Sequence, residues 1–313
     1  MHTTEVAWFH RSWTLRDLIA RKQGRTVSVV IPALNEQDTV AAVIASVREL
    51  VGTLVDELIV LDSGSTDDTI GRATAAGAVV YTREQALPGL LPRPGKGEAL
   101  WRSLAVATGD LIVFLDSDLI DPNPRFVPAL VAPLLFETHT QLVKGCYRRP
   151  LRTDSPGHYG GGRVTQLVAR PLLTALAPPL ADIMQPLGGE YAATAELLTS
   201  LPFAPGYGVE IGILLDTWMR FGADVIEQVD LGTRVHRNRP THELAVMSRQ
   251  IIATMFARLG VRDSQLGLRQ FLPDQGVWRS TVSDISLADR PPMATISDRP
   301  NTPRPSPAAL RCP

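Results

Sequence analysis

Two aspartates near the middle of the chain are the residues with the clearest capacity for chemistry. Asp116-Ser117-Asp118 comes directly after residues 111–115, which are all apolar and bounded by turn formers, as in a fully buried strand. Open α/β sheets bind ligands beyond the carboxyl ends of their strands. A hard divalent cation there would share carboxylate and diphosphate oxygens. Taken alone, such a pair is equally typical of turn chemistry or a helix cap.

The arrangement of strand, polar turn and helical segment occurs three times before residue 120, which is typical of an α/β fold. Residues 27–31 lead into a turn of Pro32, Ala33, Leu34, Asn35 and Glu36, and residues 58–61 lead into the turn 62–69, which contains Ser63. The third strand leads into the Asp pair. Right-handed crossovers bring these three strand ends to one edge of a parallel sheet. We therefore expect one composite pocket at that edge.

Two further segments suit an anion. Lys96 sits between Gly95 and Gly97 just before a helical segment, where its ammonium and the helix N-terminus can face a phosphate. A solvated loop lysine is the plainer alternative, and the spacing does not match a P-loop. The run Gly160 to Thr165 offers backbone N–H groups, the Arg163 guanidinium and the Thr165 hydroxyl, which favours an anion-binding turn over a flexible linker.

Two more segments leave their chemistry open. Glu210 lies in the first turn of a helical segment after Pro205, where it can complement the helix dipole or accept hydrogen bonds from sugar hydroxyls. Residues 234–239 contain three arginines, which is more commonly a solvated edge than a site. His236 lies among them, and the neighbouring cations keep its imidazole neutral, as a metal ligand must be.

Composition excludes several classes of protein. The chain has 313 residues, of which 44% are hydrophobic, and a formal net charge of -1, which argues against a nucleic-acid binder. Two cysteines provide neither a disulfide framework nor a thiolate zinc site, which fits a reducing cytoplasm. No segment approaches the roughly 18 apolar residues of a membrane span, and no secretory signal is recognisable.

The sequence also suggests how the chain is divided. We expect an N-terminal helical segment (1–26), an α/β region (27–150), an appended α+β region (151–273) and a disordered tail rich in proline (274–313). The break near residues 150 to 160 is predicted to separate two halves that share one core.

Taken together, these motifs resemble those of GT-A fold nucleotide-sugar glycosyltransferases. More narrowly, the chain is similar to the glucosyl-3-phosphoglycerate synthases over about residues 13–273. The residues that carry the likeness are the turn 32–36, the turn 62–67, the 116–118 signature, residues 161–165, 185–191 and 203–212, and the segment from His236 to Pro240. Residues 152–159 and the chain after Pro273 depart from the family pattern.

The resemblance implies a GT-A (Rossmann-like) fold and transfer of glucose from UDP-glucose to the 2-hydroxyl of D-3-phosphoglycerate, with retention and with Mg²⁺ or Mn²⁺. It also suggests a cytoplasmic homodimer. By resemblance, Asp118 and His236 hold the metal, and the catalytic residues are Asp118, Lys96 and Glu210. The resemblance assigns donor binding to Pro32, Ala33, Leu34, Asn35, Glu36, Ser63, Lys96, Asp116, Ser117, Tyr207, Gly208, Val209 and Glu210. It assigns acceptor binding to Gly162, Arg163, Val164, Thr165 and Asn238.

Three alternatives compete with this interpretation. A polyprenyl-phosphate glycosyltransferase shares the motifs of the first half but normally needs a membrane-associated segment. A sugar-phosphate nucleotidylyltransferase would show a Gly-rich loop where this chain has Pro32 to Glu36. A nucleotide-sugar sensor without turnover would be expected to lack Asp118 or His236, and both residues are present.

Overall fold

The structure is a computed structural model that describes residues 12–148, 162–236 and 240–297. Its centre is a seven-stranded sheet with the strand order β3-β2-β1-β4-β7-β6-β8, and only β7 runs antiparallel to its two neighbours. The strands are β1 (Val27–Ala33), β2 (Glu57–Asp62), β3 (Val79–Thr82), β4 (Leu111–Phe114), β6 (Leu142–Arg148), β7 (Tyr191–Thr194) and β8 (Ile226–Thr233).

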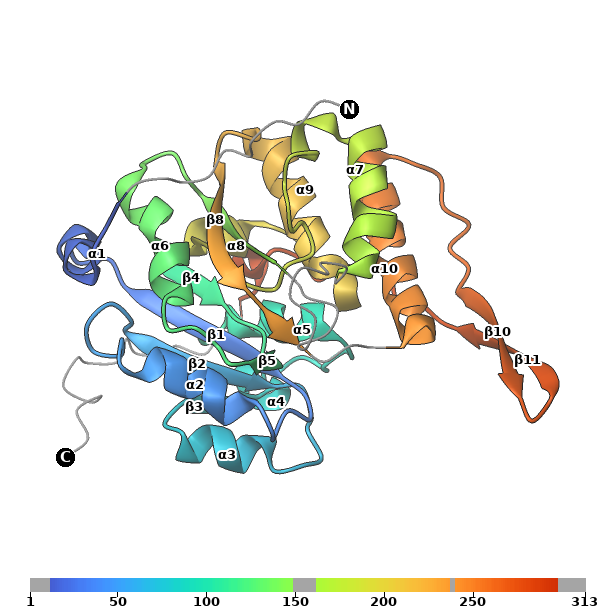
Figure 1. The fold of residues 1–313 in the computed structure, drawn as a ribbon, viewed down its shortest axis with the longest axis horizontal. Helices are drawn as coiled ribbons and strands as arrows, with labels where there is room; N and C mark the ends of the chain where they lie inside the picture. Colours follow the sequence, from blue (N-terminus) through green and yellow to red (C-terminus); the bar gives the residue numbers. More distant parts are fainter. Residues whose placement is uncertain (1–11, 149–161, 237–239, 298–313) are drawn as a thin grey trace.

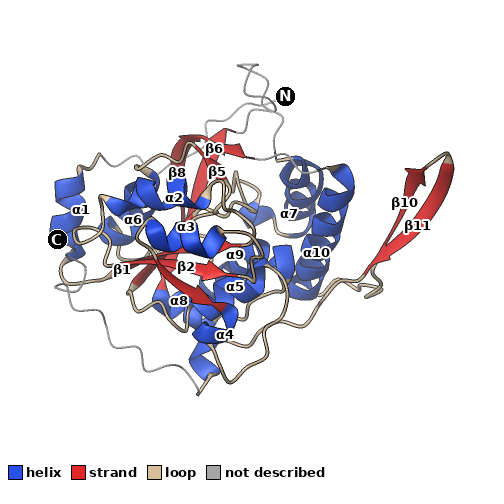
Figure 2. Ribbon diagram, turned by 90° about the horizontal axis from the view of Figure 1, so that it is seen from below, coloured by secondary structure: helices blue, strands red, loops and turns tan. Residues whose placement is uncertain are grey.

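Helices cover both faces of this sheet (Figures 1 and 2). One face is packed by α1 (Leu15–Lys22), α2 (Val40–Arg48), α3 (Thr69–Ala75) and α6 (Phe126–Phe136). The other is packed by α4 (Arg83–Ala86), α5 (Lys96–Ser103), α7 (Arg170–Leu176), α8 (Ala195–Ser200), α9 (Val209–Phe221) and α10 (Thr241–Leu259). Shorter helical turns are η1 (Thr165–Ala169), η2 (Pro178–Leu180), η3 (Gly206–Gly208) and η4 (Met293–Thr295).

Strand periodicity explains why the sheet is buried on both sides. Val29 and Ile31 of β1 point into the core beneath α2 and α6, whereas Val30 points into the core that contains α5 and α9. Successive side chains of a strand alternate between faces, so a continuous apolar run is what a strand covered on both sides requires. The predicted α/β class and the three predicted strands are therefore confirmed.

The two predicted halves share this single sheet. β7 comes from the second half of the chain, yet it pairs with β4 of the first half and with β6. The predicted boundary near residue 150 falls in the segment 149–161, outside the described residues.

The prediction of disorder after residue 273 is wrong for residues 274–297. A hairpin of β10 (Leu268–Asp274) and β11 (Val277–Ser283) crosses the proposed boundary. Further on, Arg290 and Met293 are buried against the body of the protein. Proline content misled the prediction here, because long-range partners rather than local propensity order this segment.

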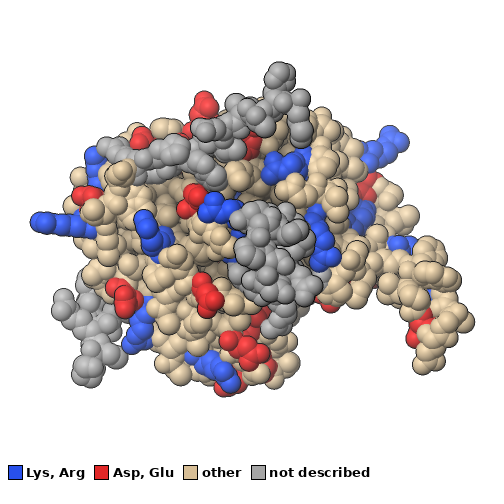
Figure 3. Space-filling view, in the orientation of Figure 1, with Lys and Arg blue, Asp and Glu red and all other residues tan. Residues whose placement is uncertain are grey.

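The surface charge and the helices bear on two classes that the composition argued against, nucleic-acid binders and membrane-spanning proteins. On the face drawn in Figure 3, Lys and Arg side chains are interspersed with Asp and Glu. Within the described part of the chain, no helix combines the length and apolarity that crossing a bilayer would demand. The β10–β11 hairpin stands clear of the body of the molecule (Figures 1 and 3).

Candidate active site

A cavity of about 410 Å³ lies where β1, β2 and β4 end, at the edge of the sheet predicted from the sequence. Short hydrogen bonds hold the three strand ends together. The Ser63 amide donates to the Ala33 carbonyl at 2.8 Å, and the Ser117 hydroxyl donates to the Pro32 carbonyl at 2.8 Å. The residues that line the cavity are Pro32, Ala33, Leu34, Glu36, Ser63, Arg83, Pro94, Gly95, Lys96, Asp116, Ser117, Asp118, Gly162, Arg163, Val164, Thr165, Leu187, Tyr207, Glu210, Arg234, Leu244 and Met247.

Three residues predicted to bind the donor lie outside this lining. Asn35 has a φ of 55°, and its side chain accepts a hydrogen bond from the Thr66 amide at 2.8 Å, so it shapes the turn. Val209 is buried in the core. A Cβ on Gly208 would lie 2.0 Å from the Thr254 hydroxyl, so this glycine lets α9 and α10 pack closely.

The centre of the cavity is a cluster of charged side chains that the sheet edge brings together. The Lys96 ammonium lies 2.5 Å from Asp116 and 2.6 Å from Glu210. The Arg234 guanidinium lies 2.7 Å from Asp116, 3.1 Å from Asp118 and 3.1 Å from Glu190. Each cation thus bridges carboxylates from segments that are far apart in the sequence.

The carboxylates keep both cations protonated. Burial disfavours charge on Lys96, but Asp116 and Glu210 outweigh burial and hold the pKa of its ammonium well above its usual range. Burial opposes charge on Arg234 as well, yet Glu190, Asp116 and Asp118 raise the pKa of its guanidinium. Lys144 on β6 lies behind the cluster, and burial lowers the pKa of its ammonium to about 8.

The backbone places the two predicted metal ligands next to each other. β5 (Leu119–Ile120) pairs with β9 (Val235–His236), and Leu119 is opposite His236 in the register. Asp118 is therefore one residue away from the strand partner of His236. Its side chain is 27% exposed and faces the cavity.

The oxygen atoms of the cluster are of the kind that a divalent cation binds. The cluster contains four carboxylates, those of Asp116, Asp118, Glu190 and Glu210, and carboxylate oxygens are the ligands that a hard divalent cation prefers. Among the described residues, no group of three or more His, Cys, Asp or Glu side chains could hold a metal. A site with two protein ligands matches a cation whose remaining positions are filled by substrate phosphate and water.

The predicted anion-binding turn forms one wall of the same cavity. Gly162 has a φ of 79°, and the chain then enters the helical turn η1 at Thr165, which is buried. The Arg163 guanidinium donates to the Thr241 hydroxyl at 3.3 Å, which links this wall to the start of α10. Asn238 lies outside the described residues.

Sequence reasoning missed Arg234 and Glu190. The view that residues 234–239 form a solvated edge is wrong for Arg234, whose side chain is only 4% exposed and sits inside the charged cluster. A signal was available, because Arg234 directly follows β8 and so lies at the carboxyl end of a strand parallel to β6. Glu190 offered no such signal, because its role depends on a partner 44 residues away.

Comparison with known proteins identifies the class to which this chain belongs. The model described as Glycosyl transferase family 2 matches residues 28–161. The chain is 62% identical to glucosyl-3-phosphoglycerate synthase of Mycolicibacterium smegmatis over 297 residues, which are 95% of this chain and 98% of that protein. It is 60% identical to the protein of the same name from Mycobacterium tuberculosis, over 94% of this chain and 93% of that protein.

Solved structures agree with the sequence comparison. The Mycobacterium tuberculosis enzyme in complex with Mn²⁺, UDP-Glc and phosphoglyceric acid superposes with a TM-score of 0.85 at 60% identity, over 92% of this chain and 97% of that chain. Its complex with Mg²⁺ and UDP gives a TM-score of 0.86 at 61% identity, with the same coverage of both chains. The chain is a glycosyltransferase, and it belongs to the glucosyl-3-phosphoglycerate synthase family.

A stability measurement tests the role of Arg234. We predict that Arg234→Met lowers the free energy of unfolding by about 3 to 5 kcal/mol, because Glu190 and the Asp pair lose the guanidinium that neutralises them. Urea denaturation gives this value. Arg48→Met is the control, because the Arg48 guanidinium donates to the Ala76 carbonyl at an exposed position. A loss no larger than that of the control would contradict the assigned role.

Proposed function

We propose that this chain transfers glucose from UDP-glucose to the 2-hydroxyl of 3-phosphoglycerate in a reaction that requires Mg²⁺ or Mn²⁺. Two features support this: the identity to relatives of that name, and the solved relatives that bind these ligands. The observation that carries the proposal is one cavity whose middle holds the carboxylates of Asp116 and Asp118 beside Lys96 and Arg234, and whose far wall is the turn of Gly162 and Arg163.

The donor would lie along the ends of the first three strands. The turn of Pro32 to Leu34, together with Glu36 and Ser63, lines the part of the cavity suited to the uridine. Asp116 is placed to contact the ribose side. Lys96 would exchange its carboxylate partners for the diphosphate, because an ammonium forms charge-assisted hydrogen bonds with phosphate oxygens as it does with carboxylates.

Asp118 and His236 would hold the divalent cation, which when bound neutralises charge on the departing diphosphate. Arg234 keeps the Asp118 carboxylate oriented at 3.1 Å and partly compensates the charge of the cluster before the donor binds. Tyr207 and Glu210 would line the glucose pocket. Glu210 is only 4% exposed and already paired with Lys96, which makes it a poor covalent nucleophile.

These features support retention by attack on the same face as the leaving group. In that step the 2-hydroxyl oxygen of the acceptor forms a bond to the glucose anomeric carbon, and the bond between that carbon and the diphosphate oxygen breaks. The hydroxyl proton passes to the departing diphosphate oxygen. The protein contributes orientation and electrostatic stabilisation, which together can supply most of the rate enhancement of such a transfer.

The acceptor would bind against Gly162, Arg163, Val164 and Thr165, with Asn238 as a further proposed contact. The Arg163 guanidinium suits a phosphate or a carboxylate, because it offers paired N–H donors to two oxygens. Leu244 and Met247 of α10 also line the cavity. An acceptor with two anionic groups therefore fits this end of the site better than a neutral alcohol.

An assay of UDP release tests the acceptor assignment. We predict that Arg163→Ala raises the KM for 3-phosphoglycerate by about tenfold to a hundredfold, the cost of a lost charge-assisted hydrogen bond, and changes the KM for UDP-glucose little. Repeating the assay with glycerate shows which anion Arg163 binds, because the effect disappears only if the partner is the phosphate. Arg48→Ala serves as the control. An unchanged KM for 3-phosphoglycerate would contradict the assignment.

We also propose a cytoplasmic homodimer. The β10–β11 hairpin supports the dimer, because Phe271, Trp278 and Val282 share one face and are 62%, 74% and 55% exposed. An isolated two-stranded hairpin is only marginally stable in water, and this one meets the body of the protein through β10, where the Gln270 side chain donates to the His242 carbonyl at 3.1 Å. A second copy of the chain would cover this face in a symmetric pair. The cytoplasm is proposed from the family resemblance and from the two cysteines of the chain, too few for the disulfide framework typical of small secreted proteins.

Analytical ultracentrifugation tests the dimer. We predict that the double variant Phe271→Glu and Trp278→Glu sediments as a monomer, because two charges cannot be buried at the centre of an apolar interface. Thr281→Glu is the matched control, since it lies on β11 with its side chain on the opposite face of the hairpin. A double variant that sediments like the wild-type dimer, or a monomeric wild type, would refute this interface.

A further inference from the structure

A short segment near the end of the described chain lies behind the walls of the active site. We call residues 288–293 the C-terminal strap. Several side chains tie it down: Arg93 donates to the Ala288 carbonyl at 2.9 Å, the Trp101 indole donates to the Pro291 carbonyl at 2.8 Å, and Arg258 pairs with Asp289 at 2.7 Å. These ties reach α5, the loop before it, and α10. The strap thus connects elements that surround the cavity.

Arg290 is the centre of the strap. Its guanidinium is buried and binds both oxygens of Glu98, at 2.7 and 2.8 Å, and the Leu91 carbonyl at 2.8 Å. It also lies over the Trp101 ring, 5.0 Å from the centroid. The backbone of Arg290 exchanges two hydrogen bonds with Phe203, at 3.0 and 2.9 Å. One residue therefore holds Glu98 with its side chain and Phe203 with its backbone.

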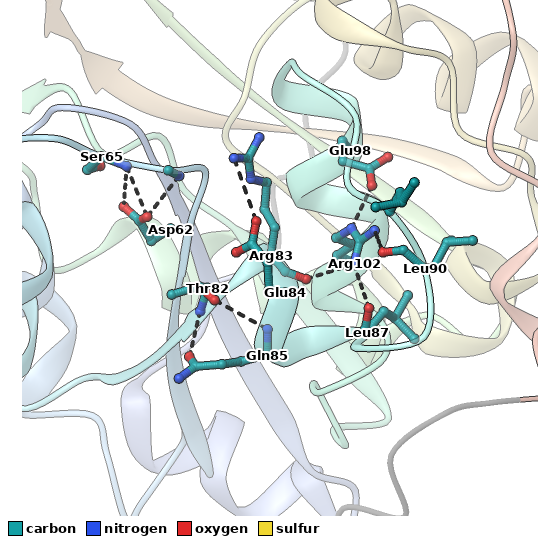
Figure 4. Close-up of polar contacts among 12 residues, drawn as sticks. Asp62, Ser65, Thr82, Arg83, Glu84, Gln85, Leu87, Leu90, Glu98 and Arg102 are labelled. Atoms are coloured by element: carbon teal, nitrogen blue, oxygen red, sulfur yellow. Dashed lines mark hydrogen bonds and ion pairs between the residues drawn. The ribbon is translucent and has the colours of Figure 1, made fainter.

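Glu98 and Phe203 belong to the two walls that carry the catalytic candidates. Glu98 lies in the first turn of α5, which begins at Lys96. Glu98 also binds Arg102, whose guanidinium reaches the Leu87 and Leu90 carbonyls, so the loop before α5 is fixed as well (Figure 4). Phe203 leads into η3 and α9, which carry Tyr207 and Glu210.

The two walls meet at glycines, where a side chain would collide with the opposite wall. A Cβ on Gly97 would lie 2.1 Å from the Ala204 carbonyl oxygen, and a Cβ on Gly95 would lie 2.9 Å from the Gly206 Cα. Across this contact the Lys96 ammonium and the Glu210 carboxylate are 2.6 Å apart. A small shift of either wall would therefore move Lys96 relative to Glu210.

We propose that Arg290 is a positioning residue for donor binding: by clamping Glu98 and Phe203 together it fixes the place of Lys96 opposite the diphosphate. This inference rests on the proposed function, because it assigns Lys96 to the donor. Arg290 itself does not line the cavity, so its effect is transmitted through α5. Misplacement of a binding group by about 1 Å is enough to cost up to about a hundredfold in rate.

The test compares three variants with wild type, using calorimetry with UDP and Mn²⁺ and the KM of each substrate. In Arg290→Met and Glu98→Gln we expect the Kd for UDP and the KM for UDP-glucose to rise by about tenfold to a hundredfold, while the KM for 3-phosphoglycerate changes by less than about threefold. Arg290→Lys keeps the positive charge but loses the bidentate hydrogen bonds to Glu98, so we expect a Kd for UDP between those of wild type and Arg290→Met.

Lys22→Met controls for lost stability. Lys22 pairs with Asp56 at 2.6 Å beyond the opposite edge of the sheet, so its loss should lower the melting temperature without changing the Kd for UDP. If Arg290→Met does not fold, the Kd of Arg290→Lys for UDP tests the inference instead. A folded Arg290 variant that binds UDP as wild type does would overturn the inference. Failure of wild type to release UDP from UDP-glucose and 3-phosphoglycerate would instead overturn the proposed function.

Discussion

The site depends on two cations, the half-buried Lys96 and the buried Arg234, that each bridge carboxylates from distant segments. Without them, Asp116, Asp118, Glu190 and Glu210 would bring several negative charges into a partly desolvated pocket, at a cost of several kcal/mol per uncompensated ion. With them, each carboxylate of the cluster has a cationic partner within 3.1 Å. The ion pairs also fix the orientation of the carboxylates.

Sheet topology produces this cluster. Asp116 and Asp118 follow β4, Arg234 follows β8, and Glu190 immediately precedes β7, which is antiparallel and therefore starts at the edge where its neighbours end. Lys96 and Glu210 begin or enter helices that pack on one face of the same sheet. Five elements thus meet at one edge. The close glycine contacts between α5 and the segment before α9 then set the spacing of their side chains.

Much of this could be predicted from sequence because it follows from local patterns. Apolar runs of strand length ending in polar turns predicted β1, β2 and β4 and the edge at which the cavity lies. The helical segment expected after Pro205 is α9. Buried charge could not be predicted in this way. Arg234 looks like a solvated arginine in a basic run, and Arg290 lies in a segment rich in proline, yet each is buried by partners far away in the chain. Gly208 and Val209 also have a packing role that the sequence did not reveal, and their assignment to donor binding stays a prediction.

The account is tested most directly by the affinity for UDP with and without Mn²⁺ in Asp118→Ala, His236→Ala and the double variant. If both residues hold one cation beside the diphosphate, each single variant loses the gain in affinity that Mn²⁺ provides, and the double variant loses little more, because the two effects are coupled. Isothermal titration calorimetry measures the affinity of wild type and of the three variants for UDP under both conditions. A Mn²⁺-dependent gain that survives in either single variant, or losses that simply add, would contradict the shared site.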